Sequence, residues 1–430
     1  MRPLLLLLLS LPLLAACTAP PRSVTAPAAI ATPAADFPPQ VAETQPEPPP
    51  READEYTRYE LLDPDSSQFH ILFEVTAITP GATVYFNPIR KGSTASGESV
   101  RDQATGQALR FEVVSGAEAR TSGLPEADVA MDYIRVRLLR PVPADGGARL
   151  LIEKTYKDPL SYNWRKGGER IVFSRTLGVR RNAIVLPAGF ELTACNAPAQ
   201  VLTEPDGRFA VSFMHPGPET FPLVIEARRS GKAQAIPAAE SERLSERAHQ
   251  DRAIVYLLQA PETHAFDLYH DYTESRPGVD RYLNVVRKGS TASKPSARNL
   301  DTGETLRVET LKGEALPKRG LSEEADIKPD DDVVVAHFAP VPAGGSARIR
   351  IAETYTDPQS YRLDGPEDNE LIFDRTFGRP RNAVVLPAGW LLTASSIPAQ
   401  VSETADGRIR LDFVNPRPDE IAVLIKARRR

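Results

Sequence analysis

Two matching sets of polar residues are the part of this chain that could do chemistry. The run Arg-Lys-Gly-Ser-Thr-Ala-Ser occupies residues 90–96 and returns unchanged at 287–293. A tyrosine, an aspartate and an arginine follow each run in the same order. The candidates are Arg90, Lys91, Ser93, Tyr156, Asp158 and Arg175 in the first copy and Arg287, Lys288, Ser290, Tyr355, Asp357 and Arg375 in the second.

Two interpretations fit these residues. An arginine beside Gly-Ser-Thr can present a guanidinium, hydroxyls and backbone amides to an anion, and the Tyr, Asp and Arg set could face a sugar or a peptide. Alternatively, Arg175 pairs with Asp158, and Arg375 with Asp357, as a brace between a strand and a loop. We favour the brace. Both interpretations stay open, because a comparison of the two copies cannot separate folding from function.

The elements that must position these residues are short strands. Runs such as 69–75, 149–156 and 348–355 alternate apolar and polar residues, and Gly, Pro and Asp punctuate them. Asp206-Gly207 and Asp406-Gly407 stand between such runs and predict tight hairpin turns. The sequence therefore predicts an all-β protein with two tandem homologous antiparallel β-sandwich domains, at residues 55–229 and 252–430, each with seven to nine strands.

The start of the chain indicates export. Residues 1–16 contain a basic start and a short apolar stretch, which predicts a signal peptide rather than a membrane span. Leu14-Ala15-Ala16-Cys17 resembles the lipobox of bacterial lipoproteins. The resemblance implies lipidation of Cys17, palmitate included, and a lipid anchor in the cell envelope. With Thr18 next, it implies the outer membrane facing the periplasm if the source is Gram-negative. A plain signal peptide is the alternative.

Two linking segments separate these parts. Residues 17–54 are rich in Ala and Pro, and predict a disordered tether between the lipidated cysteine and the first copy. Residues 230–251 predict a linker with a short helix that begins near Ile236-Pro237 and runs toward His249. The second cysteine, Cys195, stands where the second copy has Ser395, which favours a small packed residue over a nucleophile.

No motif supplies a reaction. The chain lacks the usual signatures of zinc peptidases, serine hydrolases and nucleotide-binding loops, and we predict no catalytic residue, no metal and no cofactor. A net charge of -5 without a basic stripe argues against nucleic acid. Residues 260–266 resemble the opening strand of the non-catalytic N-terminal β-domain of M61-type aminopeptidases, which implies an accessory β-fold only.

The functional prediction is a non-enzymatic envelope lipoprotein that binds or braces something outside the cytoplasm. Its expected partners are the membrane, through the N-terminal lipid, and an envelope protein or glycan. The alternative is an envelope-associated hydrolase acting on peptide or polysaccharide. An enzyme would need a carboxylate such as Asp158 or Asp357 to be unpaired in a cleft, so pairing of both with arginine would count against catalysis.

Overall fold

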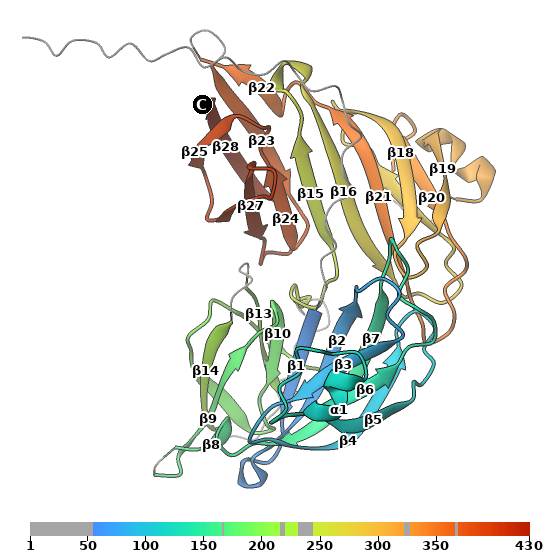
Figure 1. Cartoon of the computed structure of the whole chain (residues 1–430). Coiled ribbons are helices and arrows are strands. Elements are labelled where there is room, and N and C mark those ends of the chain that lie inside the picture. The colour runs from blue at the N-terminus through green and yellow to red at the C-terminus, as the bar shows by residue number, and fades with distance from the viewer. Residues whose placement is uncertain (1–54, 166, 216–219, 231–243, 322–326, 366–368) are drawn as a thin grey trace, which may run out of the picture. The chain divides into compact units, whose positions relative to one another are not determined.

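Strands make up almost all of the regular structure of this protein (Figure 1). The computed structural model describes residues 55–430 except 166, 216–219, 231–243, 322–326 and 366–368. The described residues belong to one compact unit. The all-β prediction is confirmed. The signal peptide, Cys17 and the tether lie outside the described residues, and among those described no helix is long and apolar enough to cross a bilayer.

The first half contains more strands than the sequence predicted. Its strands are β1 (Glu55–Leu61), β2 (Gln68–Ala77), β3 (Val84–Ile89), β4 (Thr94–Asp102), β5 (Phe111–Ser115), β6 (Asp132–Arg137), β7 (Ala148–Lys157), β8 (Tyr162–Trp164), β9 (Arg170–Leu177), β10 (Arg181–Val185), β11 (Phe190–Cys195), β12 (Gln200–Thr203), β13 (Phe209–Met214) and β14 (Phe221–Arg229).

The second half has the same succession of elements. Its strands are β15 (Ala253–Leu258), β16 (Ala265–Glu274), β17 (Arg281–Val285), β18 (Thr291–Asn299), β19 (Thr305–Lys312), β20 (Asp332–His337), β21 (Ala347–Thr356), β22 (Tyr361–Asp364), β23 (Glu370–Phe377), β24 (Arg381–Val385), β25 (Trp390–Ser395), β26 (Gln400–Glu403), β27 (Ile409–Val414) and β28 (Ile421–Arg429).

The sheets of the two halves share one strand order. A large sheet runs β12-β13-β10-β1-β2-β7-β4 in the first half, and the same order, β26-β27-β24-β15-β16-β21-β18, lies within the ten-stranded sheet of the second. A four-stranded sheet, β11-β14-β9-β8 or β25-β28-β23-β22, accompanies each. The pairing is antiparallel with one exception that the sequence did not suggest, because β1 runs parallel to β10 and β15 runs parallel to β24.

A third sheet distinguishes the halves. In the first half β3, β6 and β5 form a separate sheet, and an isolated bridge joins Arg101 on β4 to Ala108, just before β5. In the second half the matching strands β17, β20 and β19 join the large sheet through β18. The one α-helix among the described residues, α1 (Gly116–Thr121), follows β5 and begins at Ser115, whose hydroxyl accepts a hydrogen bond from the Glu118 N–H at 3.2 Å.

Each half buries its own apolar core between its large sheet and its four-stranded sheet. In the first half Phe69 and Ile184 from the large sheet meet Phe173 and Ile225 from the smaller one. The second half packs Phe266 and Val384 against Phe373 and Ile425 in the same way. Full burial of one such side chain stabilises a fold by about 1.5–3 kcal/mol, so each interior holds its two sheets together as in a β-sandwich.

Two glycines explain the turns between neighbouring strands at one edge of each large sheet. Gly207 and Gly407 adopt φ values of +83° and +78°, a conformation that favours glycine, in the turns that connect β12 to β13 and β26 to β27. The hairpins predicted at these two positions are therefore confirmed. The start of the predicted linker helix, near Ile236-Pro237, lies outside the described residues, and residues 244–249 form an irregular stretch and a turn.

Loops and the linker join the two halves. Arg149 on β7 donates to both carboxylate oxygens of Asp301, at 2.6 and 2.8 Å, and both residues are buried. The backbone N–H of Gly147 donates to the Leu300 carbonyl at 2.7 Å, and Arg247 from the linker donates to the Gly378 carbonyl at 2.9 Å. Two separate segments, residues 147–149 of the first half and the linker, therefore contact the second half through polar groups.

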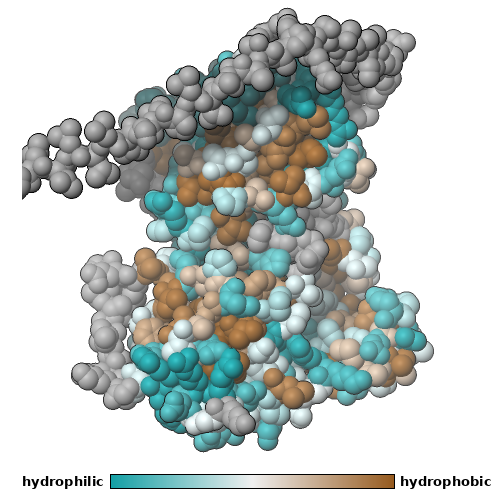
Figure 2. Space-filling view, turned by 90° about the vertical axis from the view of Figure 1, so that its left-hand side faces the viewer, coloured by the Kyte–Doolittle hydropathy of each residue, from teal (hydrophilic) through white to brown (hydrophobic). Residues whose placement is uncertain are grey.

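Polar and apolar side chains alternate on the molecular surface as well. Figure 2 shows the side of the molecule on which β13 and β27 lie in Figure 1, and its hydrophobic residues gather in patches interrupted by hydrophilic ones.

Candidate functional sites

The first candidate site is the buried ion pair that occurs in both halves. Arg175 on β9 donates to Asp158 Oδ2 at 3.1 Å, and Arg375 on β23 donates to Asp357 Oδ2 at 2.9 Å. Each aspartate directly follows a long strand, β7 or β21, and begins the turn that leads to the next strand. The pairing predicted from residue type and order is therefore present in both halves.

Further hydrogen bonds occupy each aspartate. Ser93 Oγ donates to Asp158 at 3.0 Å, and Ser290 Oγ donates to Asp357 at 2.9 Å. The hydroxyl and the backbone N–H of Ser161 also donate to Asp158, at 2.6 and 3.0 Å. Both oxygens of the Asp158 carboxylate are thus engaged, and only 3 % of the residue is exposed.

Burial and these contacts have opposite effects on the carboxylates. Burial alone would raise the pKa of Asp158, but hydrogen bonds from Ser161 and Ser93 and the charge of Arg175 together lower it below the usual value. The pKa of Asp357 is lowered for the corresponding reasons. A general acid or base needs a pKa near the working pH, so a carboxylate held ionised by an arginine and several hydrogen-bond donors is poorly suited to either role.

Aromatic rings enclose each arginine of the pair. The Arg175 guanidinium carbon lies 5.5–5.8 Å from the ring centroids of Tyr59, Phe69 and Tyr156. Arg375 lies 5.2–5.6 Å from the rings of Tyr256, Phe266 and Tyr355. Tyr156 and Tyr355 are both buried. A guanidinium within 6 Å of an aromatic face is attracted to it, so both tyrosines belong to the core that holds the arginine.

In each Arg-Lys-Gly-Ser-Thr loop, the serine contacts the buried ion pair, the arginine lies beside it, and the lysine is exposed. Arg90 donates to the Thr176 carbonyl at 3.2 Å, and Arg287 donates to the Thr376 hydroxyl. Lys91 and Lys288 are exposed. The structure therefore brings the serine, tyrosine, aspartate and arginine candidates together in each half, with Arg90 and Arg287 beside them, and leaves the two lysines outside. A ligand-binding role for the set stays a prediction.

Sequence reasoning missed a pair of buried ionisable groups near the brace. Lys154 on β7 donates to the Asn87 side-chain carbonyl, and at the matching place on β21 Glu353 accepts from Asn284 at 3.1 and 3.2 Å. Burial and the nearby Arg175 lower the pKa of Lys154 to about 7. Burial raises the pKa of Glu353. Charged residues alternate with apolar ones along these strands. The sequence alone therefore does not show whether a given charged side chain is buried or faces solvent.

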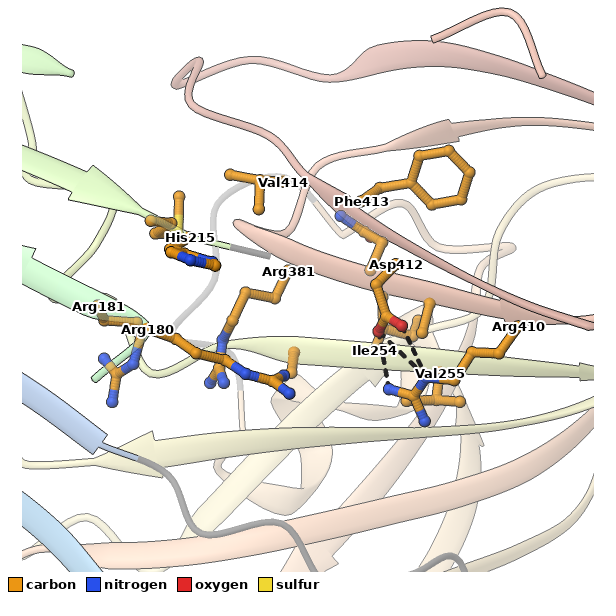
Figure 3. A pocket seen from close by; sticks show the side chains of 14 residues that line it. Arg180, Arg181, His215, Ile254, Val255, Arg381, Arg410, Asp412, Phe413 and Val414 are labelled. Atoms are coloured by element: carbon orange, nitrogen blue, oxygen red, sulfur yellow. Dashed lines mark hydrogen bonds and ion pairs between the residues drawn. The ribbon is translucent and has the colours of Figure 1, made fainter. Parts of the chain in front are cut away.

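The second candidate site is a pocket at the junction of the two halves (Figure 3). In that view Arg180, Arg181 and His215 come from the first half, whereas Arg381, Arg410 and Asp412 come from the second. Its apolar lining is Met214, Ala253, Ile254, Val255, Ala383, Phe413 and Val414, and Asn382 completes it. The repeated dipeptides Arg181-Asn182 and Arg381-Asn382 were the available sequence signal for this place.

The single carboxylate that lines the pocket already has a partner. Arg410 donates to both oxygens of Asp412, at 2.8–3.1 Å. Arg381 contacts Asp251, a residue of the linker, at 3.3 Å. Arg181 donates to the backbone carbonyls of Ala248 and His249, at 3.0 and 3.2 Å. The lining is therefore predominantly cationic.

The matching face of the first half is covered by the linker. Glu246 accepts hydrogen bonds from the Tyr56 hydroxyl and from Ser212 Oγ, each at 2.8 Å. Ser212 pairs with Ala183 on β10, as Asp412 pairs with Ala383 on β24, so the two faces correspond position by position. The same sheet surface thus receives a carboxylate from the linker in one half and borders the pocket in the other.

Histidine and cysteine positions give no metal centre among the described residues, where no group of three potential ligands was found. His264 lies in the turn before β16 and contacts the Tyr361 carbonyl at 3.0 Å, while His270 is buried within β16. These two histidines therefore do not share a strand. Cys195 contacts the Ala197 carbonyl just as Ser395 contacts that of Ile397, and burial raises the pKa of the Cys195 thiol.

Comparison with known proteins identifies no family for this chain. No protein-family model matches it. No curated protein matches it either.

The solved structures give a faint likeness to aminopeptidases. An M1 zinc metallopeptidase from Deinococcus radiodurans is 13% identical, with a TM-score of 0.27 over 42% of this chain and 43% of that chain. An aminopeptidase N family protein from Idiomarina loihiensis is 12% identical, with a TM-score of 0.24 over 40% of this chain and 29% of that one. This chain thus covers less than half of either protein, and scores this low carry no functional argument.

The resemblance seen at residues 260–266 is likewise coarse. These structures are described as M1 or aminopeptidase N proteins rather than M61 enzymes. Within the segment, Pro261–Thr263 form a 3-10 turn, and a strand begins only at Ala265. The expected opening strand is therefore mostly a turn.

Proposed function

We propose that this protein is a non-catalytic, lipid-anchored component of a bacterial cell envelope, and that its two β-sandwiches form a rigid module that binds or braces a partner there. The lipobox-like Leu14-Ala15-Ala16-Cys17 supports the anchor. Attachment through several acyl chains would be durable, whereas a single chain holds a protein only marginally. The membrane would be the outer one, with the module facing the periplasm, if the source is Gram-negative.

The observation that carries the non-catalytic part is the engagement of both shared aspartates. Asp158 and Asp357 are buried, each is paired with an arginine, and each accepts from a serine hydroxyl. A hydrolase built on these residues would need one of them free to reach a substrate or a water. The pairing therefore favours binding or support over the hydrolase alternative.

The anchor is tested by fractionation of cells that express the full chain or its Cys17→Ser variant. We expect the unmodified chain in the membrane fraction and the variant in the soluble fraction. Cys195→Ser is the matched control, because Ser395 already fills that role in the second half, and it should fractionate like the unmodified chain. Equal membrane retention of Cys17→Ser would refute the lipid anchor.

The hydrolase alternative is tested with the purified full chain on envelope peptides and glycans. We expect no turnover that depends on Asp158 or Asp357. Hydrolysis that is lost in both Asp158→Asn and Asp357→Asn, while each variant remains folded, would establish the alternative and overturn the proposal.

A further inference from the structure

We propose that the pocket between the two halves is an oxyanion-binding site, which takes the carboxylate or phosphate group of a ligand. The proposal deepens the binding role proposed above by naming a place and a chemistry for it. The pocket is defined here by Arg180, Arg181, Arg381, Arg410, Asp412 and their apolar neighbours.

The charge of the lining selects for an anion. Four arginines and one aspartate line the pocket, a formal excess of three positive charges, 4 minus 1. The linker residue Asp251, which contacts Arg381 from outside the lining, reduces this excess to two. Arg410 donates to both oxygens of Asp412. Among the described lining residues, no other carboxylate is present to bind a cation.

The lining combines guanidinium groups from both halves with apolar side chains. Arg180 and Arg381 belong to different halves and line the same pocket, whose apolar lining includes Ile254, Val255 and Ala383 (Figure 3). A guanidinium presents parallel N–H donors that match the two oxygens of a carboxylate or a phosphate. Apolar walls lower the local dielectric constant, which strengthens that attraction relative to bulk water.

The first half supplies a precedent for the chemistry. There the corresponding sheet face binds the Glu246 carboxylate through Tyr56 and Ser212, while Arg181 binds two backbone carbonyls of the same segment. In the second half the position of Ser212 is taken by Asp412, and the position of Arg181 is taken by Arg381. An arginine directed at oxygen acceptors is therefore common to both faces.

The methionines provide a direct test. The chain has three, Met1, Met131 and Met214, and only Met214 lines the pocket. The full chain, labelled with [13C]methyl-methionine and kept in an uncharged detergent, is titrated with inorganic phosphate, N-acetylglutamate or sodium chloride. We expect a saturable shift of the Met214 methyl with phosphate, N-acetylglutamate or both, and no saturable shift of Met131.

Arginine variants assign the effect to the pocket. Arg180 is exposed, so Arg180→Gln should fold and should weaken the binding at least about fivefold, because one charge-assisted hydrogen bond is lost. Arg180→Glu should abolish it. Arg110→Gln removes another exposed arginine outside the pocket and should leave the titration unchanged. An unaltered Met131 signal verifies that each variant remains folded.

The outcomes separate cleanly. Saturation with phosphate only, or with N-acetylglutamate only, supports the site and identifies its source of oxyanion. An equal response to chloride, or binding that Arg180→Gln and Arg180→Glu leave intact, overturns the proposal. The titration needs neither lipid nor partner, so a negative titration would not contradict the proposed anchored, non-catalytic role. Equally, membrane retention of Cys17→Ser would contradict the anchor but not this site.

Discussion

At the scale of single residues, the shared polar side chains stabilise the fold through one another. Their types and order suffice to predict that Arg175 meets Asp158 and that Arg375 meets Asp357, because a buried arginine requires a carboxylate. The aromatic surroundings and the serine donors depend on which strands become neighbours, and that information is not local. Lys154 and Glu353 were unpredictable for the same reason: their burial comes from strands distant in sequence.

The depressed pKa of Lys154 makes stability depend on pH. In the unfolded chain this lysine holds its proton up to a pH of about 10.4. In the folded chain it loses the proton above pH about 7. Between these values the unfolded state binds more protons, so stability rises with pH, by up to about 1.4 kcal/mol per pH unit. Lys154→Met should remove that slope in urea unfolding measured from pH 7 to 10.

The control for this measurement lies on the same strand. Lys157 ends β7 and is exposed, so Lys157→Met should keep the slope of the unmodified chain. Identical slopes for Lys154→Met and the unmodified chain would mean that Lys154 is charged and solvated when the protein is folded.

At the scale of elements, the alternating pattern and the turn residues predicted most strands of the structure. Residues 69–75 lie within β2, residues 149–156 within β7, and residues 348–355 within β21. The parallel pairing of β1 with β10 could not be predicted, because strands distant in sequence leave no turn signal between them. In the described end of the linker, residues 244–249, Glu246 and Arg247 contact the two halves, and such tertiary contacts can outweigh local helix propensity.

Close packing around α1 gives a prediction for glycine substitutions. A Cβ atom added at Gly116 would lie 1.9 Å from the carbonyl oxygen of Asp128, and one at Gly313 would lie 2.0 Å from that of Lys328. Neither oxygen belongs to a flexible side chain. Gly116→Ala and Gly313→Ala should each destabilise the protein by on the order of 3 kcal/mol, measured by chemical denaturation.

Gly178→Ala is the comparison for these variants. A Cβ atom there would meet nothing within 4 Å, and its stability should stay within about 0.5 kcal/mol of the unmodified chain. A loss as large as that of Gly116→Ala would show that the cost arises from removing a glycine rather than from the close contact.

At the scale of the whole molecule, the two halves are coupled by buried polar contacts rather than by a shared apolar core. The ion pair of Arg149 with Asp301 is the most buried of them, because both side chains are at most 5 % exposed. Removing one partner from a buried pair leaves an uncompensated charge and costs about 3–5 kcal/mol. The linker adds Arg247, which contacts carbonyls of the second half.

Each half holds one of the two tryptophans, Trp164 and Trp390, so their unfolding can be followed separately. In Trp164→Phe and Trp390→Phe backgrounds, fluorescence should report coincident unfolding of both halves. Arg149→Met should separate the two transitions. Arg135→Met, which removes an ion pair with the half-exposed Glu112, should leave them coincident. Coincident transitions in Arg149→Met would show that other contacts couple the halves.

The most direct test of the account is urea unfolding of Arg175→Met and Arg375→Met, each followed through the tryptophan of its own half. If the shared residues brace the fold, each variant should lose about 3–5 kcal/mol of unfolding free energy. Wild-type stability in both variants, together with loss of binding or of hydrolysis, would contradict the account and assign these arginines to a functional site.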